Sequence, residues 1–328
     1  MAVNRQEDTM DKSSNAPVES NVPIEEESYG PNRENPCFAP VDWDPRGYDI
    51  QAWLHRSPWR LLKDTDYGCR SDVSPPLPCL YEDALLAQVY KMDIATFLTA
   101  ERVSMLGISA LVSSAPDEAA QVFLATQAVD EARHYEVFCR RLADFGVTPA
   151  QRERLIEHVT TPEMKRFYDL IREQVDKRDF VGAMLAHNVI LEGMAYPVYR
   201  YETRYWSKID PGLAQIIQGA FADEVQHVGF GENITRQYAR GDVAARNRVN
   251  RLVRDFHRLM TEVFEAVIRH HIGIYQEAAN GHMDIMGDIE IFPGRPMATV
   301  TEEEQVRLLL YDVQDEHARR LKRIDLGV

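Results

Sequence analysis

Two short strings of one kind, DEARH at 130–134 and DEVQH at 223–227, constrain this chain more than any other feature. Each string lies among apolar residues at helical spacing and places a Glu three residues before a His. Positions i and i+3 share one face of a helix, so each string can offer a carboxylate oxygen and an imidazole nitrogen to one metal ion. The pair of strings therefore predicts two helices that hold two metal ions.

Two further acids, Glu101 and Glu192, each lie alone in an apolar helical stripe, where a carboxylate is normally excluded. Four inward-facing carboxylates would repel one another strongly unless they were protonated or matched by positive charge. Two divalent cations would cancel their charge, and two neutral imidazoles would complete the coordination. The predicted metal ligands are Glu101, Glu131, His134, Glu192, Glu224 and His227.

The spacing of these residues predicts the fold. Glu131 follows Glu101 by 30 residues, and Glu224 follows Glu192 by 32, about the length needed to return to the same depth on an antiparallel helix. The 61 residues from Glu131 to Glu192 leave room for a crossover with one or two extra helices. We expect an all-α protein in which two helical hairpins form one four-helix bundle.

In ligand type and order, residues 82–240 resemble the ferritin-like di-iron carboxylate proteins of the oxygen-activating group. That group includes ribonucleotide reductase small subunits, bacterial di-iron monooxygenases, desaturases and N-oxygenases. The resemblance implies a ferritin-like bundle core with additional helices, two Fe ions or Mn at one or both positions, and O2 as co-substrate. Oxygen and imidazole ligands suit these metals, and the four cysteines form no CxxC pair.

The same resemblance implies roles for the neighbours of the ligands. Asp130 would orient His227, and Asp223 would orient His134, each by accepting a hydrogen bond. Arg133 is either an exposed helix cation or a member of this buried network. His187, His270 and His271 have no acid three residues before them, so we expect structural or surface roles for them.

Three classes of function stay open. The leading one is a di-iron oxidase or oxygenase that activates O2 to oxidise a small or medium organic metabolite with an apolar or aromatic part. The others are a radical-generating subunit similar to that of ribonucleotide reductase and an iron oxidation or storage protein. Phe138 stands where the radical subunit usually has Tyr, Ala220 where aryl amine N-oxygenases add a His, and Gln226 where desaturases have an Arg. Storage proteins of this fold are generally much shorter.

Tyr196 lies one turn after Glu192 and is the predicted catalytic phenol; its alternative is a core tyrosine bonded to a backbone carbonyl. Pro197 removes a helix hydrogen bond and predicts a kink there, which could widen a substrate pocket. The predicted pocket walls are Phe97, Leu98, Met105, Phe138 and Ala195.

The remaining chain sets the expected domain organisation. Residues 1–36 hold eight acids and three bases and predict a disordered acidic tail, and 37–328 predict a single domain. Within it we expect an irregular arm over 37–81, the di-metal bundle over 82–240 and accessory helices over 241–328, with a long helix at 243–277, a loop at 281–299 and a last helix at about 301–324.

The expected location and partners follow from charge and composition. No secretory signal is recognised and no apolar run approaches the roughly 20 residues of a membrane helix, so we expect a cytoplasmic enzyme with no membrane partner. The net charge of −15 and the lack of a basic motif argue against nucleic acid. The expected partners are a small organic substrate, an electron donor such as a reductase or ferredoxin, and a second copy of the chain in a homodimer.

Overall fold

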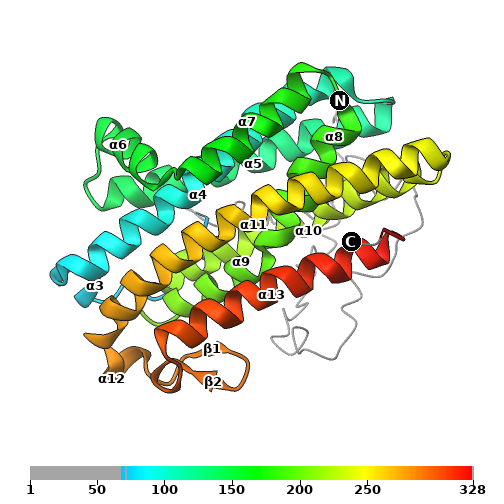
Figure 1. The fold of residues 1–328 in the computed structure, drawn as a ribbon. Helices are drawn as coiled ribbons and strands as arrows, with labels where there is room; N and C mark the ends of the chain where they lie inside the picture. The colour runs from blue at the N-terminus through cyan, green and yellow to red at the C-terminus, as the bar shows by residue number, and fades with distance from the viewer. Residues whose placement is uncertain (1–67, 71, 327–328) are drawn as a thin grey trace, which may run out of the picture. The chain divides into compact units, whose positions relative to one another are not determined.

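A computed structural model describes residues 68–70 and 72–326 of the chain, and this part is almost entirely helical (Figure 1). The expectation of an all-α fold is confirmed. The predicted tail over 1–36 and most of the predicted arm over 37–81 lie outside the described residues. The longer helices are α4 (Ala84–Leu111), α5 (Glu118–Asp144), α6 (Pro149–Val159), α7 (Pro162–Asp176), α9 (Gly193–Trp206), α10 (Pro211–Ala239), α11 (Val243–Asn280) and α13 (Glu302–Arg323).

Short elements join these helices. They are α3 (Cys79–Glu82), the 3-10 turns η4 (Val112–Ser114) and η6 (Met297–Thr299), α8 (Phe180–Met184), the π-helix η5 (Leu185–Glu192), α12 (Met283–Met286), β1 (Glu290–Phe292) and β2 (Arg295–Pro296). The two strands pair antiparallel. They occupy the segment 281–299 that was expected to be a loop.

Capping residues set where the core helices begin. The side chains of Asp83, Asp117 and Asp210 accept backbone N–H groups at the starts of α4, α5 and α10. Each satisfies a donor that the first helical turn leaves unpaired. Pro211 follows Asp210 as the first residue of α10, where its missing N–H costs nothing.

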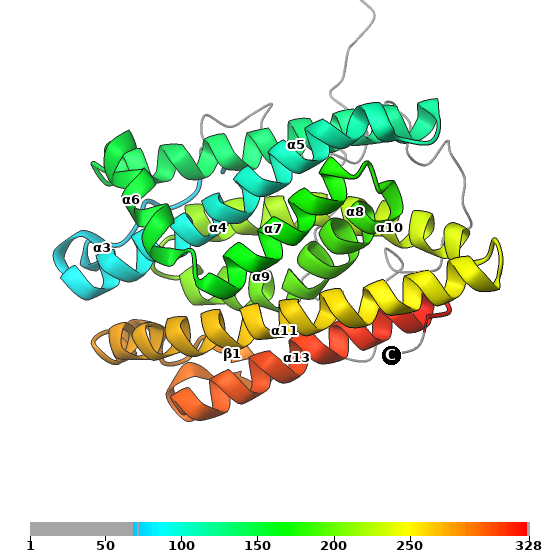
Figure 2. The same ribbon diagram turned by 45° about the horizontal axis from the view of Figure 1, so that its top comes forward.

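Four segments form the core bundle: α4, α5, η5 continued by α9, and α10. Helix α4 packs along α5, and α10 packs along both α9 and η5 (Figures 1 and 2). The crossover between the two hairpins consists of α6, α7 and α8. Helix α11 packs against α4, α7 and η5, and α13 lies along α9 and α11. Thus α7, α11 and α13 enclose the bundle on the side of α4 and α9.

The helix that carries Glu192 is irregular before that residue. The segment Leu185–Glu192 is a π-helix, and α9 continues from Gly193 with Pro197 inside it. The sequence predicted an irregular turn after Glu192, at Pro197, whereas the π-helix lies before it, at Leu185–Glu192. A π-turn brings residues five apart close together, and such turns are frequent at functional sites.

One described helix is long and apolar enough to cross a membrane by length and composition alone. It is α4 continued through η4, Ala84–Ser114. The expectation that no segment reaches this length and hydropathy is therefore wrong. In the structure this helix packs along α5 and buries Glu101 on its inner face.

Candidate di-metal centre

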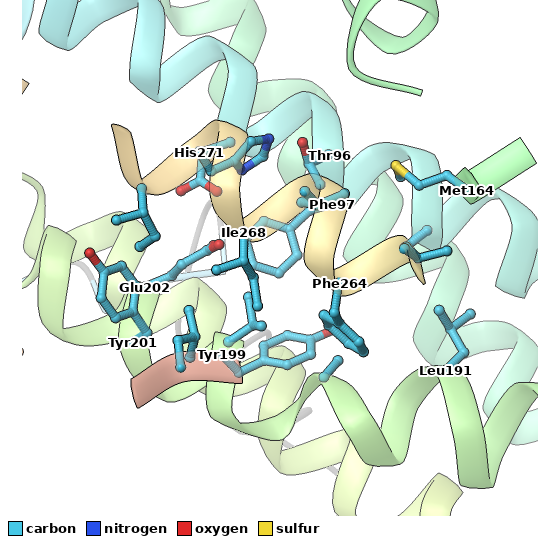
Figure 3. A pocket seen from close by; sticks show the side chains of 18 of the residues that line it. Thr96, Phe97, Met164, Leu191, Tyr199, Tyr201, Glu202, Phe264, Ile268 and His271 are labelled. Carbon is cyan, nitrogen blue, oxygen red and sulfur yellow. The ribbon is translucent and has the colours of Figure 1, made fainter. Parts of the chain in front are cut away.

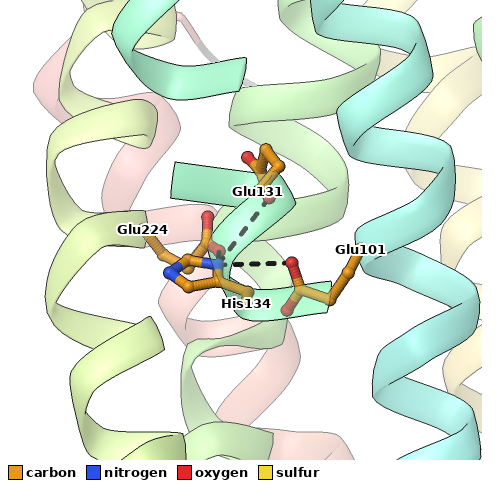
Figure 4. Close-up of side chains that lie close together, drawn as sticks. All are labelled: Glu101, Glu131, His134 and Glu224. Atoms are coloured by element: carbon orange, nitrogen blue, oxygen red, sulfur yellow. Dashed lines mark hydrogen bonds and ion pairs between the residues drawn. The ribbon is translucent and has the colours of Figure 1, made fainter. Parts of the chain in front are cut away.

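The core bundle brings all six predicted ligands to one place. Their side chains are buried, with at most 6% of the residue surface exposed. They form two groups of four, and within each group one potential ligand atom per residue lies within 4.8 Å of the others. The groups are Glu101, Glu131, His134 and Glu224, shown in Figure 4, and Glu131, Glu192, Glu224 and His227. Because Glu131 and Glu224 belong to both groups, they are placed to bridge two metal ions.

The first histidine is oriented by contacts at both ring nitrogens. His134 Nδ1 lies 3.3 Å from Glu101 Oε2 and 3.7 Å from Glu224 Oε1, while Nε2 lies 3.0 Å from Asp223 Oδ2. An aspartate accepting from Nε2 keeps the proton there and leaves Nδ1 free to bind a metal.

The second histidine repeats this arrangement with the aspartate of the other string. His227 Nδ1 lies 3.1 Å from Glu224 Oε2 and 3.2 Å from Glu131 Oε1, and Nε2 lies 3.5 Å from Asp130 Oδ2. The structure therefore places Asp130 beside His227 and Asp223 beside His134, as the resemblance implied.

Arg133 joins the two aspartates. Its guanidinium donates to Asp130 Oδ1 at 3.2 Å and to Asp223 Oδ2. The side chain is 14% exposed, so of the two alternatives for Arg133 the structure shows the buried network. The cation offsets the charge of two carboxylates that the bundle would otherwise bury close together.

The pKa shifts and hydrogen bonding of the ligand carboxylates indicate a place for positive charge in the cluster. Burial raises the pKa of Glu101 to about 7, and burial with the charges of Glu192 and Glu131 raises that of Glu224. Glu131 is the opposite case: despite burial, its pKa is lowered to about 2, chiefly by His227. Glu101 Oε1 and Glu192 Oε2 are buried without a hydrogen-bond partner. Glu101 and Glu192 belong to different four-residue groups, so each group has an unpaired buried oxygen that a cation would satisfy, and the cluster can hold two metal ions.

Metal loading should weaken as pH falls. Burial alone would lower the pKa of His134 and His227, but the charges of Glu101 and Glu224 respectively raise both well above the ordinary range. These protons must leave before a metal binds. We expect the affinity for Mn(II) to fall about tenfold or more per unit between roughly pH 8 and pH 6. Calorimetry in buffers of different ionisation enthalpy would measure the released protons, and an affinity that stays constant over this range would contradict the expectation.

The structure adds polar residues that the sequence did not single out. Gln127 donates to Glu192 Oε1 at 3.1 Å and to Glu131 Oε1 at 3.3 Å, and Asn188 donates to Gln127 at 3.1 Å. Gln127 is one turn before Glu131 on the same helical face, so its position could have been read from the sequence.

His187 is also part of this polar set. It is buried, and its Nδ1 lies 3.0 Å from Glu192 Oε1. Of the two expected roles, surface or structural, the structure shows the structural one; the contact with Glu192 was not expected and arises because the π-helix brings residues five apart together. His270 is exposed, whereas His271 is buried and lines the cavity described below.

Tyr196 is buried in the core and does not line the cavity described in the next paragraph. Its hydroxyl donates to the backbone carbonyl of Glu224 at 3.1 Å, and the Arg320 guanidinium lies over its ring at 3.8 Å from the centroid. This is the core arrangement given as the alternative for Tyr196.

A cavity of about 120 Å³ lies beside the metal cluster, between α4, α7, α9 and α11 (Figure 3). Two of the predicted wall residues, Phe97 and Ala195, line this cavity. Leu98 is fully buried in the core, Met105 is half-buried on α4, and Phe138 lines a second cavity of about 30 Å³ that also touches His134. The prediction of the walls therefore matches the larger cavity at two positions of five.

Tyr199 is a cavity residue that is influenced by the charge of the cluster. It lines the cavity, and burial together with the charges of Glu224, Glu101, Glu131 and Glu192 raises its pKa well above the ordinary range. Its ring packs against Phe97, with centroids 5.4 Å apart. Tyr168 on α7 also lines the cavity, and the charge of Glu101 contributes to its raised pKa. Tyr199, two turns after Glu192, is the cavity phenol influenced by all four ligand carboxylates, whereas the sequence alone favoured Tyr196.

Comparisons with known proteins identify the fold. No protein-family model and no curated protein matches the sequence. Among solved structures, a mutant of an R2-like ligand-binding oxidase with an aerobically reconstituted Mn/Fe cofactor has a TM-score of 0.55 at 19% identity, covering 86% of this chain and 92% of its own. Another mutant, with an anaerobically reconstituted Mn/Fe cofactor, has a TM-score of 0.54 at 20% identity, covering 86% and 88%. The chain has the ferritin-like fold of these oxidases.

Proposed function

We propose that this protein is a di-metal oxidoreductase that uses O2 to oxidise a small organic molecule with an apolar or aromatic part. The observation that carries the proposal is a mostly apolar cavity next to the ligand helices, whose wall includes Tyr199, a phenol with a pKa raised by burial and by the charges of four ligand carboxylates. Ala100 and Leu191, which also line the cavity, immediately precede the ligands Glu101 and Glu192. An apolar cavity with few polar groups is typical of a site for an organic ligand.

The metals are proposed to be two Fe ions or an Mn/Fe pair. The ligand set holds carboxylates and imidazoles and no thiolate, which suits either metal. The structural neighbours, described as oxidases, carry Mn/Fe cofactors. Bound in this cluster, the two ions would supply the electrons that reduce O2. An electron donor would return the pair to its reduced state if turnover requires it.

The residues around the cluster have defined tasks. Asp223 accepts from Nε2 of His134 at 3.0 Å, and Asp130, 3.5 Å from Nε2 of His227, is placed to do the same when the ring binds a metal, so that Nδ1 of each ring is the atom offered to a metal. Gln127 fixes Glu131 and Glu192 by donating to both. The Tyr199 hydroxyl, whose high pKa keeps its proton in place, can hold a hydrogen bond between substrate and cluster. The apolar walls exclude bulk water from the reacting atoms.

The test is O2 chemistry of the loaded protein. Anaerobic Fe(II) loading should give about two irons per chain. Exposure to O2 should then produce a visible absorption band with measurable O2 consumption, and Glu131→Ala should lose both, because Glu131 belongs to both ligand groups. Absence of bound metal under iron-replete conditions would refute the proposal. A stable tyrosyl radical signal that requires a second protein for turnover would instead favour the radical-generating class.

A further inference from the structure

The end of the larger cavity remote from the metal cluster carries two acids. Asp93 on α4 and Glu202 on α9 both line the cavity and are buried, with 1% and 6% of their surfaces exposed. Asp93 precedes Glu101 by eight residues, and Glu202 follows Glu192 by ten, so the acids lie roughly 12–15 Å along their helices from the cluster. Figure 3 shows Glu202, Tyr201 and His271 toward one end of the cavity and Leu191 and Met164 toward the other.

The two acids interact with each other, and each leaves one carboxyl oxygen without a partner. The Trp206 Nε1–H donates to Asp93 Oδ2 at 2.5 Å, but Asp93 Oδ1 and Glu202 Oε2 are buried without a hydrogen-bond partner. Burial raises the pKa of Asp93, and burial with the charge of Asp93 raises that of Glu202 well above its ordinary range. Buried polar atoms in native proteins nearly always have a hydrogen-bond partner in the protein or in water, so two orphaned carboxyl oxygens in a cavity wall call for an explanation.

Nothing in the described cavity wall supplies a positive charge. The lining contains neither lysine nor arginine, and burial, together with His270, lowers the pKa of His271 to about 4, so that ring is neutral near pH 7. Aromatic rings, whose faces attract cations, surround the same end; Tyr201 and Tyr275 stack there with centroids 6.3 Å apart. The site therefore favours a cation and disfavours an anion.

We propose that Asp93 and Glu202 bind the protonated amino group of a small organic monoamine whose apolar body fills the rest of the cavity. An ammonium group offers the hydrogen-bond donors that Asp93 Oδ1 and Glu202 Oε2 lack. A metal ion fits less well, because among the described residues these two acids belong to no cluster of three or more ligating groups. The proposal deepens the proposed function if the bound amine is also the molecule oxidised, but binding itself does not depend on that function.

The size of the cavity limits the amine. Its volume of about 120 Å³ is close to the cavity of about 150 Å³ that holds benzene in an engineered protein. Benzene has six non-hydrogen atoms, so a short alkylamine of up to about five fits this volume, and an arylalkylamine or a long-chain amine does not. We therefore use butylamine as the probe, with 1-butanol as its neutral counterpart and butanoate as its anionic counterpart.

Binding of the three probes to the full chain, metal-free and metal-loaded, tests the proposal by calorimetry. The amine should bind at least tenfold more tightly than the alcohol, and the anion should not bind. Glu202→Gln should weaken amine binding about 10- to 100-fold and leave the alcohol unchanged. The control variant is Glu157→Gln, which removes the same charge from an exposed residue of α6 that does not line the cavity. It should leave both amine and alcohol binding unchanged.

Equal affinity for the amine and the alcohol in the wild-type protein would overturn the proposal without any variant. Unchanged amine binding in a folded Glu202→Gln protein would also overturn it, and Asp93→Asn gives a second variant if that protein does not fold. Tight amine binding without O2-dependent oxidation would leave this site established and the proposed function refuted. Oxidation of neutral molecules, with no preference for amine binding, would support the proposed function and refute the amine site.

Discussion

Glu224→Ala should lower the affinity for both metal ions, whereas Glu101→Ala should reduce the bound metal from about two ions per chain to about one. The reason is that Glu224 belongs to both four-residue groups, and Glu101 belongs to one. Substituting residues that only support metal ligands typically costs 10- to 100-fold in affinity, so we expect a loss of about 100-fold or more for a shared ligand. Metal content after dialysis against a weak chelator, with calorimetric titration of Mn(II), measures both quantities.

The matched control for this comparison is Glu136→Ala. Glu136 is exposed on α5, the helix of Glu131 and His134, and forms a surface ion pair with Arg140. It should keep wild-type metal content, because a surface pair contributes little to the fold and nothing to the cluster. Equal losses in Glu101→Ala and Glu224→Ala would show that Glu224 does not bridge the two ions.

Glu101→Gln should stabilise the metal-free protein by about 3 kcal/mol near pH 8, although it removes a metal ligand. The folded-state pKa of Glu101 is raised to about 7 from an ordinary value of 4.5. Stability from a carboxyl with a raised pKa is fully present below its unfolded pKa and is lost as pH rises through the folded pKa. Wild-type protein should therefore lose this stability between about pH 4.5 and pH 7, and glutamine, which does not titrate, should not.

Urea unfolding of chelator-treated proteins at about pH 5 and pH 8 measures this effect. Glu136→Gln, the surface control, should follow the wild type. With metal bound the order should reverse, because the wild type gains binding energy that the variant lacks. A Glu101→Gln protein that is no more stable than wild type at the higher pH, with metal removed, would contradict the expectation.

Much of the candidate site was predictable because its spacing is local. A Glu three residues before a His shares its helical face whatever the rest of the protein does. The apolar stripes around Glu101 and Glu192 likewise identified buried acids, and the helix of 243–277 was expected where α11 runs from Val243 to Asn280.

Other parts of the site were not predictable in this way. His187 meets Glu192 because Leu185–Glu192 is a π-helix, and the apolar pattern of that segment is the same for an ordinary helix. The choice between Tyr196 and Tyr199 depends on how α9 is rotated against α10 and α11. Only two of the five predicted wall residues line the larger cavity. A stripe of apolar residues indicates which side chains are buried, but it does not indicate where their packing leaves a cavity.

The sequence by itself determined the helical class, the order of the bundle and the six candidate ligands, since these follow from periodicity and from distances along one helix. Only the tertiary structure decided that Glu131 and Glu224 are shared, that Tyr199 lines the cavity under the influence of the cluster's charge, and that Asp93 and Glu202 meet at the far end of that cavity. Asp93 and Glu202 are 109 residues apart in the chain. Their meeting is set by the packing of α4 against α9 and α11, which the spacing of residues along a single helix does not encode.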